Sequence, residues 1–387
     1  MADLRGIVAL AVALTLAGCG APQPTPMETP PGSAADTPSV PPSVPATASL
    51  PAAEPLSGTP FAVQELGRFD EPWAMTFLTD GDALITERAG RLVLRHADGR
   101  STEVTGVPEV VHQGQGGLGD VIVSPDFATD HTVYLSWAAR GTGGSGAEVG
   151  RATLINDANG ARLDGLSVIW RQQPKTSGNG HYGHRLAFSP DGAHLFVSSG
   201  ERQKMTPAQD RSNTLGTIVR MDPDGGNAEI WSYGHRNPLG IAFDATGNLW
   251  SSEMGPQGGD ELNLIRQGRN YGWPLASNGS HYGGADIPDH KPGDGFEAPL
   301  VWWNPSVSPG SLMIYSGAMY PQWQGDAFIG ALSGQALIRV DLDGTKARKA
   351  DQWDFGDRVR EVEQAPDGSI WVLTDGSEGR LLRLTPA

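Results

Sequence analysis

A degenerate pattern recurs six times after residue 61, and no other feature of the sequence restricts the fold as much. Each copy has a pair of apolar residues, a turn with residues such as Pro-Asp-Gly, and an alternating strand. The copies begin at Ala74, Asp120, Arg185, Leu239, Ser316 and Val362. Their spacing of roughly 45 to 80 residues is typical of repeated sheet units with loop insertions. The pattern predicts an all-β fold, a six-bladed β-propeller of four-stranded antiparallel sheets, with a two-sheet sandwich as the alternative.

The composition agrees with many short strands and turns, because the chain has 52 Gly and 30 Pro. A formal net charge of −16 argues against a nucleic-acid-binding protein, since binding to phosphates needs a basic face. Cys19 is the only cysteine, so no disulfide can form within the chain. A fold without disulfides must depend on its core or on bound metal, and eleven Trp residues make a large core plausible.

The first sixty residues predict export and a tether. The apolar run Ile7–Leu16 is too short to span a bilayer but fits a signal-peptide core. It leads into Leu-Ala-Gly-Cys19, which resembles a bacterial lipoprotein cleavage site, although an ordinary secretory peptide with a chance cysteine is the alternative. We expect a signal peptide at 1–18, a disordered Pro/Ala/Thr-rich tether at 19–60 and the propeller at 61–387. The protein would then be extracytoplasmic, in the periplasm or at the cell surface of a bacterium, with the lipid on Cys19 as its only membrane contact.

Many candidate functional residues lie in the segment Gly234–Pro274. Its sequence is GHRNPLGIAFDATGNLWSSEMGPQGGDELNLIRQGRNYGWP. Apolar residues on both sides of the turn Asp244–Asn248 indicate a β-hairpin. The His-Arg-Asn corner, the Gly-Pro turn, the acidic pair and the aromatic turn therefore lie in loops beside this hairpin. Loops held by a rigid sheet are where functional residues usually lie.

From Phe61 to the C-terminus, the sequence resembles the soluble quinoprotein sugar dehydrogenases, and within them the aldose sugar dehydrogenase branch. The motifs that carry this resemblance are QGGLGDVIVSPDF, GNGHYGHRLAF, YGHRNPLG, GPQGGDELNLIRQGRNYGWP and DRVREVEQAPDGSIWVLTD. The resemblance implies a six-bladed propeller that carries pyrroloquinoline quinone and Ca²⁺. It also implies oxidation of the anomeric hydroxyl of aldose sugars to lactones, with electrons passing to an external acceptor.

The resemblance implies that His181 is the general base, through its spacing to Arg185. A neutral imidazole suits removal of a hydroxyl proton, whereas a loop histidine bonded to a carbonyl is the structural alternative. Glu201 ends the following strand, where an acid would orient the imidazole; a solvated charge is equally compatible with the sequence. His184, in the same motif, is not favoured as the base.

The resemblance places five further residues around the quinone. Arg236 would hold its oxygens and stabilise negative charge, and Asn237 would add a donor, although a structural Arg that bonds loop carbonyls is the alternative. Gln115, Arg358 and Arg360 match the remaining contacts. Alternation puts Arg358 and Arg360 on one face of a strand, where two like charges need an anion, unless that face is outward and solvated.

Two calcium sites are implied in the same way. Main-chain carbonyls of Gly255 and Pro256 would bind the ion that contacts the quinone and acts as a Lewis acid. A second, structural ion would bind the Glu261 side chain and the main-chain oxygen of Tyr271, next to Asp260. From spacing alone, these residues are a turn and a pair of surface acids.

The sequence departs from the family at Ser333. The family usually has a lysine after a Leu in this loop, whereas here Ser333 follows Leu332 and no lysine is near. Either another cation contacts the quinone, or cofactor affinity is lower. This departure keeps open a binding propeller without catalysis, and a metal-dependent hydrolase of the lactonase type is a further alternative.

Overall fold

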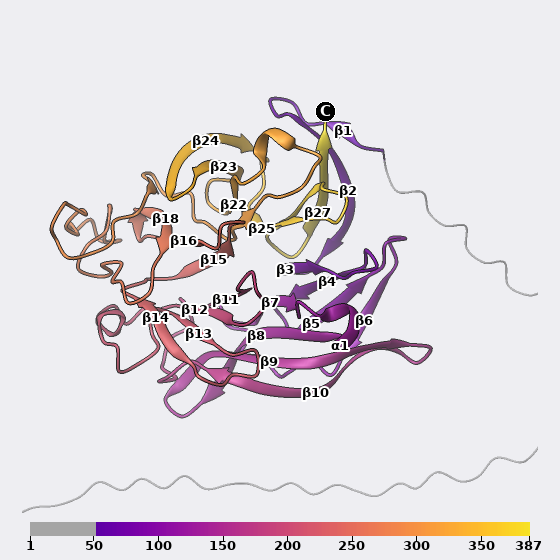
Figure 1. Ribbon diagram of the computed structural model, residues 1–387, viewed down its shortest axis with the longest axis horizontal. Helices are drawn as coiled ribbons and strands as arrows, with labels where there is room; N and C mark the ends of the chain where they lie inside the picture. The colour runs from indigo at the N-terminus through magenta and orange to yellow at the C-terminus, as the bar shows by residue number, and fades with distance from the viewer. Residues whose placement is uncertain (1–51) are drawn as a thin grey trace, which may run out of the picture. The chain divides into compact units, whose positions relative to one another are not determined.

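The computed structural model describes residues 52–387, and these residues form strands arranged around one centre (Figure 1). The predicted all-β propeller is confirmed. The predicted signal peptide, Cys19 and most of the tether lie outside the described residues. In the part of the chain that is described, no helix has the length and apolar character needed to cross a membrane.

The first two blades share one eight-stranded sheet. Blade 1 contains β3 (Pro72–Phe77), β4 (Ala83–Glu87), β5 (Arg91–Arg95) and β6 (Ser101–Thr105). Blade 2 contains β7 (Leu118–Val123), β8 (Thr132–Gly141), β9 (Gly144–Asp157) and β10 (Gly160–Arg171), with helix α1 (Phe127–Asp130) between β7 and β8. Outer strands β6 and β10 pair in parallel, with Val104 opposite Ala161. This pairing fuses the two blades at their outer edges.

The next three blades are separate four-stranded sheets. Blade 3 contains β11 (Gly183–Phe188), β12 (Leu195–Ser199), β13 (Thr217–Met221) and β14 (Glu229–Tyr233), with the 3-10 turn η1 (Thr206–Gln209). Blade 4 contains β15 (Pro238–Phe243), β16 (Leu249–Glu253), β18 (Asp260–Ile265) and β20 (Val301–Trp303), beside the small ribbon β17 (Gln257–Gly258) and β19 (Gly279–Ser280). Blade 5 contains β21 (Met313–Ile314), β22 (Ala327–Ala331), β23 (Ala336–Asp343) and β24 (Lys346–Asp354), with η2 (Pro321–Trp323).

The sixth blade joins the two ends of the described chain. It contains β25 (Val359–Gln364), β26 (Ile370–Thr374), β27 (Gly379–Pro386), β2 (Phe61–Phe69) and β1 (Glu54–Pro55). Strand β2 pairs antiparallel with β27, so an N-terminal strand completes a blade begun by C-terminal strands. The sequence placed the start of the domain near Phe61, but β1 already pairs with β2 through Glu54 and Val63.

The hairpin predicted in the central stretch is β15–β16, with Phe243 opposite Leu249. Asp244 holds its turn, because one carboxylate oxygen accepts the backbone N–H groups of Thr246 and Asn248, each at 2.9 Å. The other oxygen accepts the indole N–H of Trp250 at 2.9 Å. These bonds lower the pKa of Asp244 to about 2 although burial acts to raise it.

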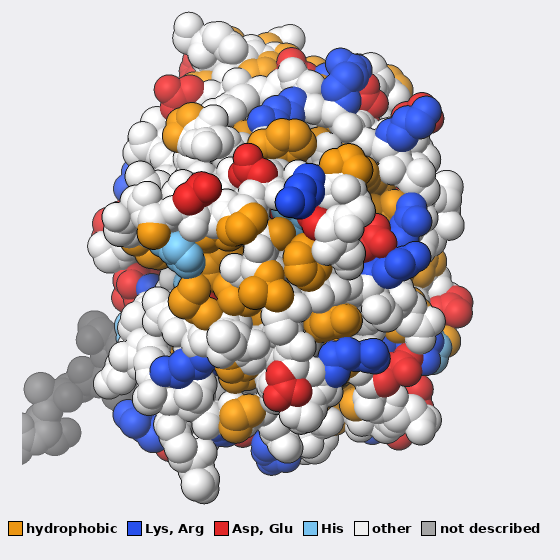
Figure 2. Space-filling view, turned by 90° about the vertical axis from the view of Figure 1, so that its left-hand side faces the viewer, with side chains coloured by type: hydrophobic (Ala, Val, Ile, Leu, Met, Phe, Trp, Pro, Cys, Tyr) orange, Lys and Arg blue, Asp and Glu red, His pale blue; other side chains and the backbone are white. Residues whose placement is uncertain are grey.

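Apolar side chains fill the space between neighbouring blades, as the tryptophan content predicted. Buried tryptophans are Trp73, Trp137, Trp170, Trp250, Trp273, Trp303, Trp323 and Trp371. Trp302 instead points outward and is 48% exposed. On the face seen in Figure 2, acidic and basic side chains are interspersed, and apolar side chains gather near the middle.

Candidate active site

A cavity of about 370 Å³ lies at one end of the ring, where the inner strands begin. Every blade, or the loop that leads into it, contributes to the wall. The lining residues are Trp73, Arg88, Gly114, Gln115, Tyr182, Gly183, His184, Asn237, Leu239, Met254, Tyr282, Ser308, Leu332, Arg358, Arg360 and Asp375. Residues distant in sequence therefore converge here, as a propeller predicts.

His181 lies on the Gly-rich loop before β11, next to the cavity residue Tyr182. Only 7% of its side chain is exposed. Its backbone N–H donates to Oε1 of Gln115 at 2.7 Å, and its carbonyl accepts the backbone N–H of Arg202 at 3.2 Å. This bond ties His181, which does not itself line the cavity, to Gln115, which does, although the two are 66 positions apart in sequence.

Glu201 contacts the imidazole directly, with 2.5 Å between its Oε1 and Nδ1 of His181. Burial acts to raise the pKa of Glu201, but hydrogen bonds from His181 and the backbone of Met205, with the charge of Arg236, lower it. Burial, together with the charges of Arg236 and Arg202, lowers the pKa of His181 although Glu201 acts to raise it, and this direction favours the neutral imidazole near pH 7. An ionised Glu201 that accepts Nδ1–H leaves the lone pair on Nε2, the arrangement that a general base requires.

His184 has different surroundings although it lines the cavity. Its ring stacks on Trp73 at 5.0 Å, and Nδ1 lies 3.0 Å from Oγ of Ser136. Burial, followed by the charge of Arg185, lowers the pKa of His184 to about 3. With no carboxylate bonded to its ring in the described chain, this imidazole packs as a neutral wall residue.

Arg236 and Asn237 precede β15 and are organised by Glu253, which ends β16. One oxygen of Glu253 accepts both of their backbone N–H groups, and the other lies 2.9 Å from Nδ1 of His235. The Arg236 guanidinium donates to the carbonyls of Met254 (3.0 Å) and Gly255 (2.8 Å), and to the hydroxyl of Tyr282 (2.9 Å). Arg236 therefore bonds loop carbonyls, which was the structural alternative, and the same bonds hold its charge in a fixed position.

Arg358 and Arg360 lie on one face, as alternation predicted, and both line the cavity. The carboxylate that offsets them comes from Asp375, directly after β26. Asp375 accepts from Nε of Arg358 at 2.9 Å, and from Nε and Nη2 of Arg360 at 3.2 and 3.1 Å. Burial acts to raise the pKa of Asp375, but the two guanidinium groups lower it. Both Nη groups of Arg358 have no hydrogen-bond partner among residues 52–387.

Gly255 and Pro256 lie beside the cavity rather than in its wall, which their neighbour Met254 lines. The Gly255 N–H donates to Asp260 at 2.8 Å, and its carbonyl accepts from Arg236. A carbonyl oxygen has two lone pairs, so one remains for another partner. Through Arg236, the turn is connected to Glu201, the partner of His181, because the carbonyl of Arg236 accepts the N–H of Glu201 at 2.9 Å.

A smaller cavity of about 10 Å³, the size of a single ion or water, lies next to this turn. Its lining includes Glu253, Glu261 and Tyr271. Glu261 is 8% exposed and lies opposite Glu253 in the β16–β18 ladder. Burial and then the charge of Glu253 raise the pKa of Glu261 well above its usual value. A cation would offset these carboxylates, and hard oxygen donors fit Ca²⁺.

Tyr271 also lines this small cavity. Its hydroxyl is committed to the carbonyl of Leu264 at 2.6 Å and its ring stacks on His235 at 4.6 Å. The phenol is therefore unavailable, and the main-chain oxygen is the donor left to Tyr271. Within residues 52–387, no three His, Cys, Asp or Glu side chains are grouped to hold a metal. An ion here must therefore use main-chain oxygens as well.

Ser333 does not line the cavity, although its neighbours Leu332 and Ser308 do. Its hydroxyl lies 2.8 Å from that of Ser308. Arg88 is a cavity cation that the sequence analysis did not identify. It donates to the carbonyls of Gly114 and Gly116 and pairs with Glu71 at 3.2 Å. These bonds fix the loop of Gln115.

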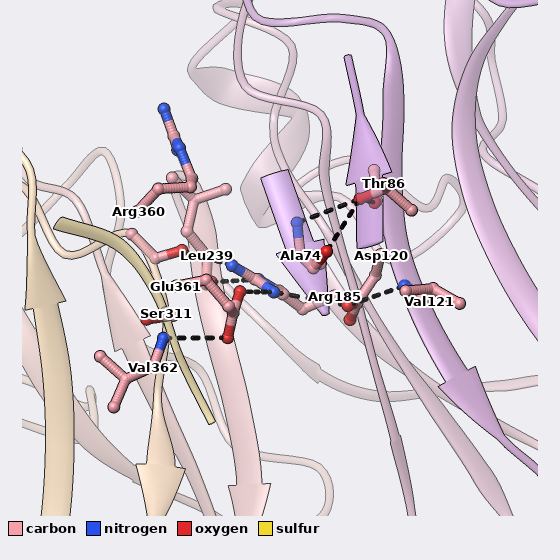
Figure 3. Close-up of polar contacts among 12 residues, drawn as sticks. Ala74, Thr86, Asp120, Val121, Arg185, Leu239, Ser311, Arg360, Glu361 and Val362 are labelled. Carbon is pink, nitrogen blue, oxygen red and sulfur yellow. Dashed lines mark hydrogen bonds and ion pairs between the residues drawn. The ribbon is translucent and has the colours of Figure 1, made fainter. Parts of the chain in front are cut away.

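Further along the inner strands, Arg185 lies between residues of several blades (Figure 3). It donates to the carbonyls of Leu239 and Gly310, each at 2.7 Å, and pairs with Asp120 and Glu361. Its guanidinium lies 4.0 Å from the Trp73 ring. Burial raises the pKa of Glu361 to about 8, although Arg185 opposes this. Arg185 thus joins several blades directly under the cavity wall.

The sequence analysis also missed Asp375, Tyr282 and Glu253. A signal for two of them was present: four of the six copies end on an acid, at Glu87, Glu201, Glu253 and Asp375. In an antiparallel hairpin, the end of the second strand lies beside the start of the first. An acid there can therefore bind the loop that enters the blade. For Tyr282, the sequence offered only a weaker signal, an aromatic residue next to two glycines.

Comparison with known proteins assigns residues 69–383 to the family described as Glucose / Sorbosone dehydrogenase. The aldose sugar dehydrogenase YliI of Escherichia coli is 40% identical over 343 residues, which are 82% of this chain and 91% of that protein.

Two solved structures are also similar. The soluble aldose sugar dehydrogenase of Escherichia coli in its apo-form superimposes with a TM-score of 0.79 and 38% identity, covering 84% of this chain and 100% of that one. The aldose sugar dehydrogenase of Streptomyces coelicolor, solved in its PQQ-bound form, gives a TM-score of 0.70 and 30% identity, covering 84% and 98%.

Proposed function

The chain belongs to the Glucose / Sorbosone dehydrogenase family, and we propose that it oxidises the anomeric hydroxyl of aldose sugars to lactones with bound pyrroloquinoline quinone. The observation that carries this proposal is the His181–Glu201 contact, next to Tyr182 in the lining of a cavity with three arginines. A base with its lone pair on Nε2 can take the hydroxyl proton of the sugar. When bound, the quinone supplies the hydride acceptor.

The residues present fit an anionic cofactor. Arg358 and Arg360 are held by Asp375 through bonds that leave both Nη groups of Arg358 free, and guanidinium groups bind carboxylates well. Gln115 and Asn237 use their amide oxygens for the N–H groups of His181 and Gly183, so their amide nitrogens remain as donors. In the absence of the lysine expected at Ser333, these arginines and Arg88 supply the positive charge.

Arg236 has a separate part in the proposal. Its charge is fixed beside the cavity by two carbonyls and Tyr282, so it can stabilise negative charge that develops during oxidation without reorganising. Ca²⁺ at the carbonyls of Gly255 and Pro256 would act as a Lewis acid, and Ca²⁺ at Glu261 and Tyr271 would offset the buried carboxylates. Electrons would then leave to an external acceptor.

Reconstitution tests the proposal. We expect purified apoprotein to reduce an electron-accepting dye with aldoses only when pyrroloquinoline quinone and Ca²⁺ are both added. His181→Asn should lower the rate by about 10²- to 10⁴-fold, because the base is removed while the cavity is kept. Surface variant His194→Asn is the matched control and should keep the wild-type rate. Activity without the quinone, or none with both additions, would contradict the proposal.

The same experiment separates the alternatives. Tight quinone binding by absorbance without dye reduction would indicate a propeller that only binds the cofactor. Lactone hydrolysis without added quinone would indicate a metal-dependent hydrolase.

A further inference from the structure

Arg202 is a completely buried cation beside the site, and it does not line the cavity. It follows Glu201 directly, on a loop where Arg202, Gln203 and Met205 all have positive φ, at 59°, 59° and 61°. Non-glycine residues in this region are strained and persist only where the surroundings hold them. The loop after β12 is therefore kept in a costly conformation that places Arg202 inward.

The Arg202 guanidinium holds the loop that carries His181. It donates through Nη1 to the carbonyl of Gly180 and through Nη2 to that of Gly178, the latter at 2.7 Å. Nη2 also donates to Oγ of Ser145 at 3.1 Å. A guanidinium that bonds two carbonyls of one loop fixes the backbone conformation of that loop. Without these bonds, the glycines would leave the backbone conformation free.

The same side chain supports the residue after His181. The guanidinium carbon lies 3.6 Å from the ring centroid of Tyr182, which lines the cavity. The Tyr182 hydroxyl lies 2.7 Å from Oγ of Ser145. In addition, the backbone N–H of Arg202 donates to the carbonyl of His181. Arg202 thus contacts the chain immediately before, at and after His181.

A buried guanidinium is costly unless it is paired. Among the described residues, no carboxylate hydrogen-bonds this one; its partners are carbonyls and a hydroxyl. Apolar residues could fill such a space at lower cost. The charge and the fork shape are therefore expected to serve the site.

We propose that Arg202 is a positioning residue that fixes the imidazole of His181 against Glu201 and keeps it ready to accept a proton. The inference rests on the proposed function of His181 as the base. Arg202 itself does not touch the cavity, so it acts through the loop and through its charge.

The charged groups that face His181 are Glu201, Arg236 and Arg202. Burial is the main cause that lowers the pKa of His181, Glu201 raises it, and both arginines lower it. Removing the Arg202 charge should therefore raise this pKa. The base would then be protonated up to a higher pH, and the acid limb of the rate profile would move to higher pH.

The test compares Arg202→Gln with Arg202→Lys. In Arg202→Gln, we expect kcat to fall about 10- to 100-fold, since the reacting geometry is lost, and the His181 pKa to rise by about one unit. In Arg202→Lys, the charge remains but the fork is lost, so kcat should fall while the His181 pKa stays near the wild-type value. NMR titration of the apoprotein, with His181 assigned from His181→Asn, gives the pKa without cofactor.

Arg220→Gln is the matched control, because Arg220 is also stacked on an aromatic ring in blade 3 but belongs to β13. It should change neither kcat nor the His181 pKa. Arg202→Gln with wild-type kcat and an unchanged His181 pKa would overturn the inference.

If Arg202→Gln does not fold, Arg202→Lys provides the test, and a wild-type kcat in that variant would overturn the inference. A wild type inactive with quinone and Ca²⁺ would count against the proposed function, whereas the apoprotein titration would still test Arg202.

Discussion

Two histidines three residues apart show how the surroundings decide the role of one residue type. His181 and His184 share a Gly-rich motif, and both have positive φ, at 51° and 57°. His181 contacts Glu201, while His184 contacts Ser136 and stacks on Trp73. Residue type alone could not separate them; the resemblance favoured His181, and the carboxylate beside its ring is the physical reason.

The substitution Glu201→Gln tests whether the carboxylate of Glu201 controls the protonation of His181. The pKa of His181 already lies below its usual value because of burial, and Glu201 partly opposes that shift. Losing the carboxylate should lower the pKa further, so the acid limb of kcat/KM should move to lower pH. The rate should fall about 10²- to 10⁴-fold. The amide of Gln can donate to Nδ1 of His181, which favours the tautomer with hydrogen on Nε2 and removes the lone pair that the base needs.

The measurement is kcat/KM against pH with the reconstituted enzyme. Glu103→Gln, an exposed acid of blade 1, should reproduce the wild-type profile. A Glu201→Gln profile whose acid limb moves upward would show that Glu201 does not act on the imidazole in this way.

The pairing of the first and second strands within a blade, such as β15 and β16, shows a rule at the scale of elements. An acid at the end of the second strand of a blade, or just after it, binds the loop that enters the blade: Glu201 binds His181, Glu253 binds Arg236 and Asn237, and Asp375 binds Arg358. Antiparallel pairing brings these positions together in each blade. In blade 4, a second acid, Glu261, lies opposite Glu253, and both acids line the small cavity together with Arg236.

Calcium should therefore stabilise the apoprotein through the strand pair β16–β18. A ligand that binds only the folded state adds about 2.7 kcal/mol when present at 100 times its Kd. We expect Ca²⁺ without quinone to raise the Tm of the wild type and to have much less effect on Glu261→Gln. Calorimetry with and without chelator measures this. Glu229→Gln, on the neighbouring blade, should respond like the wild type; an equal response of Glu261→Gln would place the ion elsewhere.

At the scale of the molecule, the ring depends on one blade built from both ends of the described chain. Strand β27 lies between β26 and β2, and Leu384 is buried there in one cluster with Phe61 and Ile370. Every blade contributes to the cavity wall, so closing the ring also sets the geometry of the site.

Leu384→Ala should lower the free energy of unfolding by about 2–5 kcal/mol, the usual cost of a cavity in a packed core. Denaturant titration measures the change. Thr385→Ala, its less buried neighbour on the opposite face of β27, should cost much less. Equal losses in the two variants would mean that this closure contributes little to stability.

The sequence by itself determined the number of blades and their hairpins, because these features repeat locally in each copy. It did not predict the fused sheet of blades 1 and 2, since the β6–β10 pairing joins two copies and neither carries a signal for it. Only the tertiary structure decided that Asp375 offsets the two arginines and that Arg88 and Arg202 fix the loops of Gln115 and His181. These contacts join residues that meet only when the ring closes, and one-dimensional periodicity does not encode such distances.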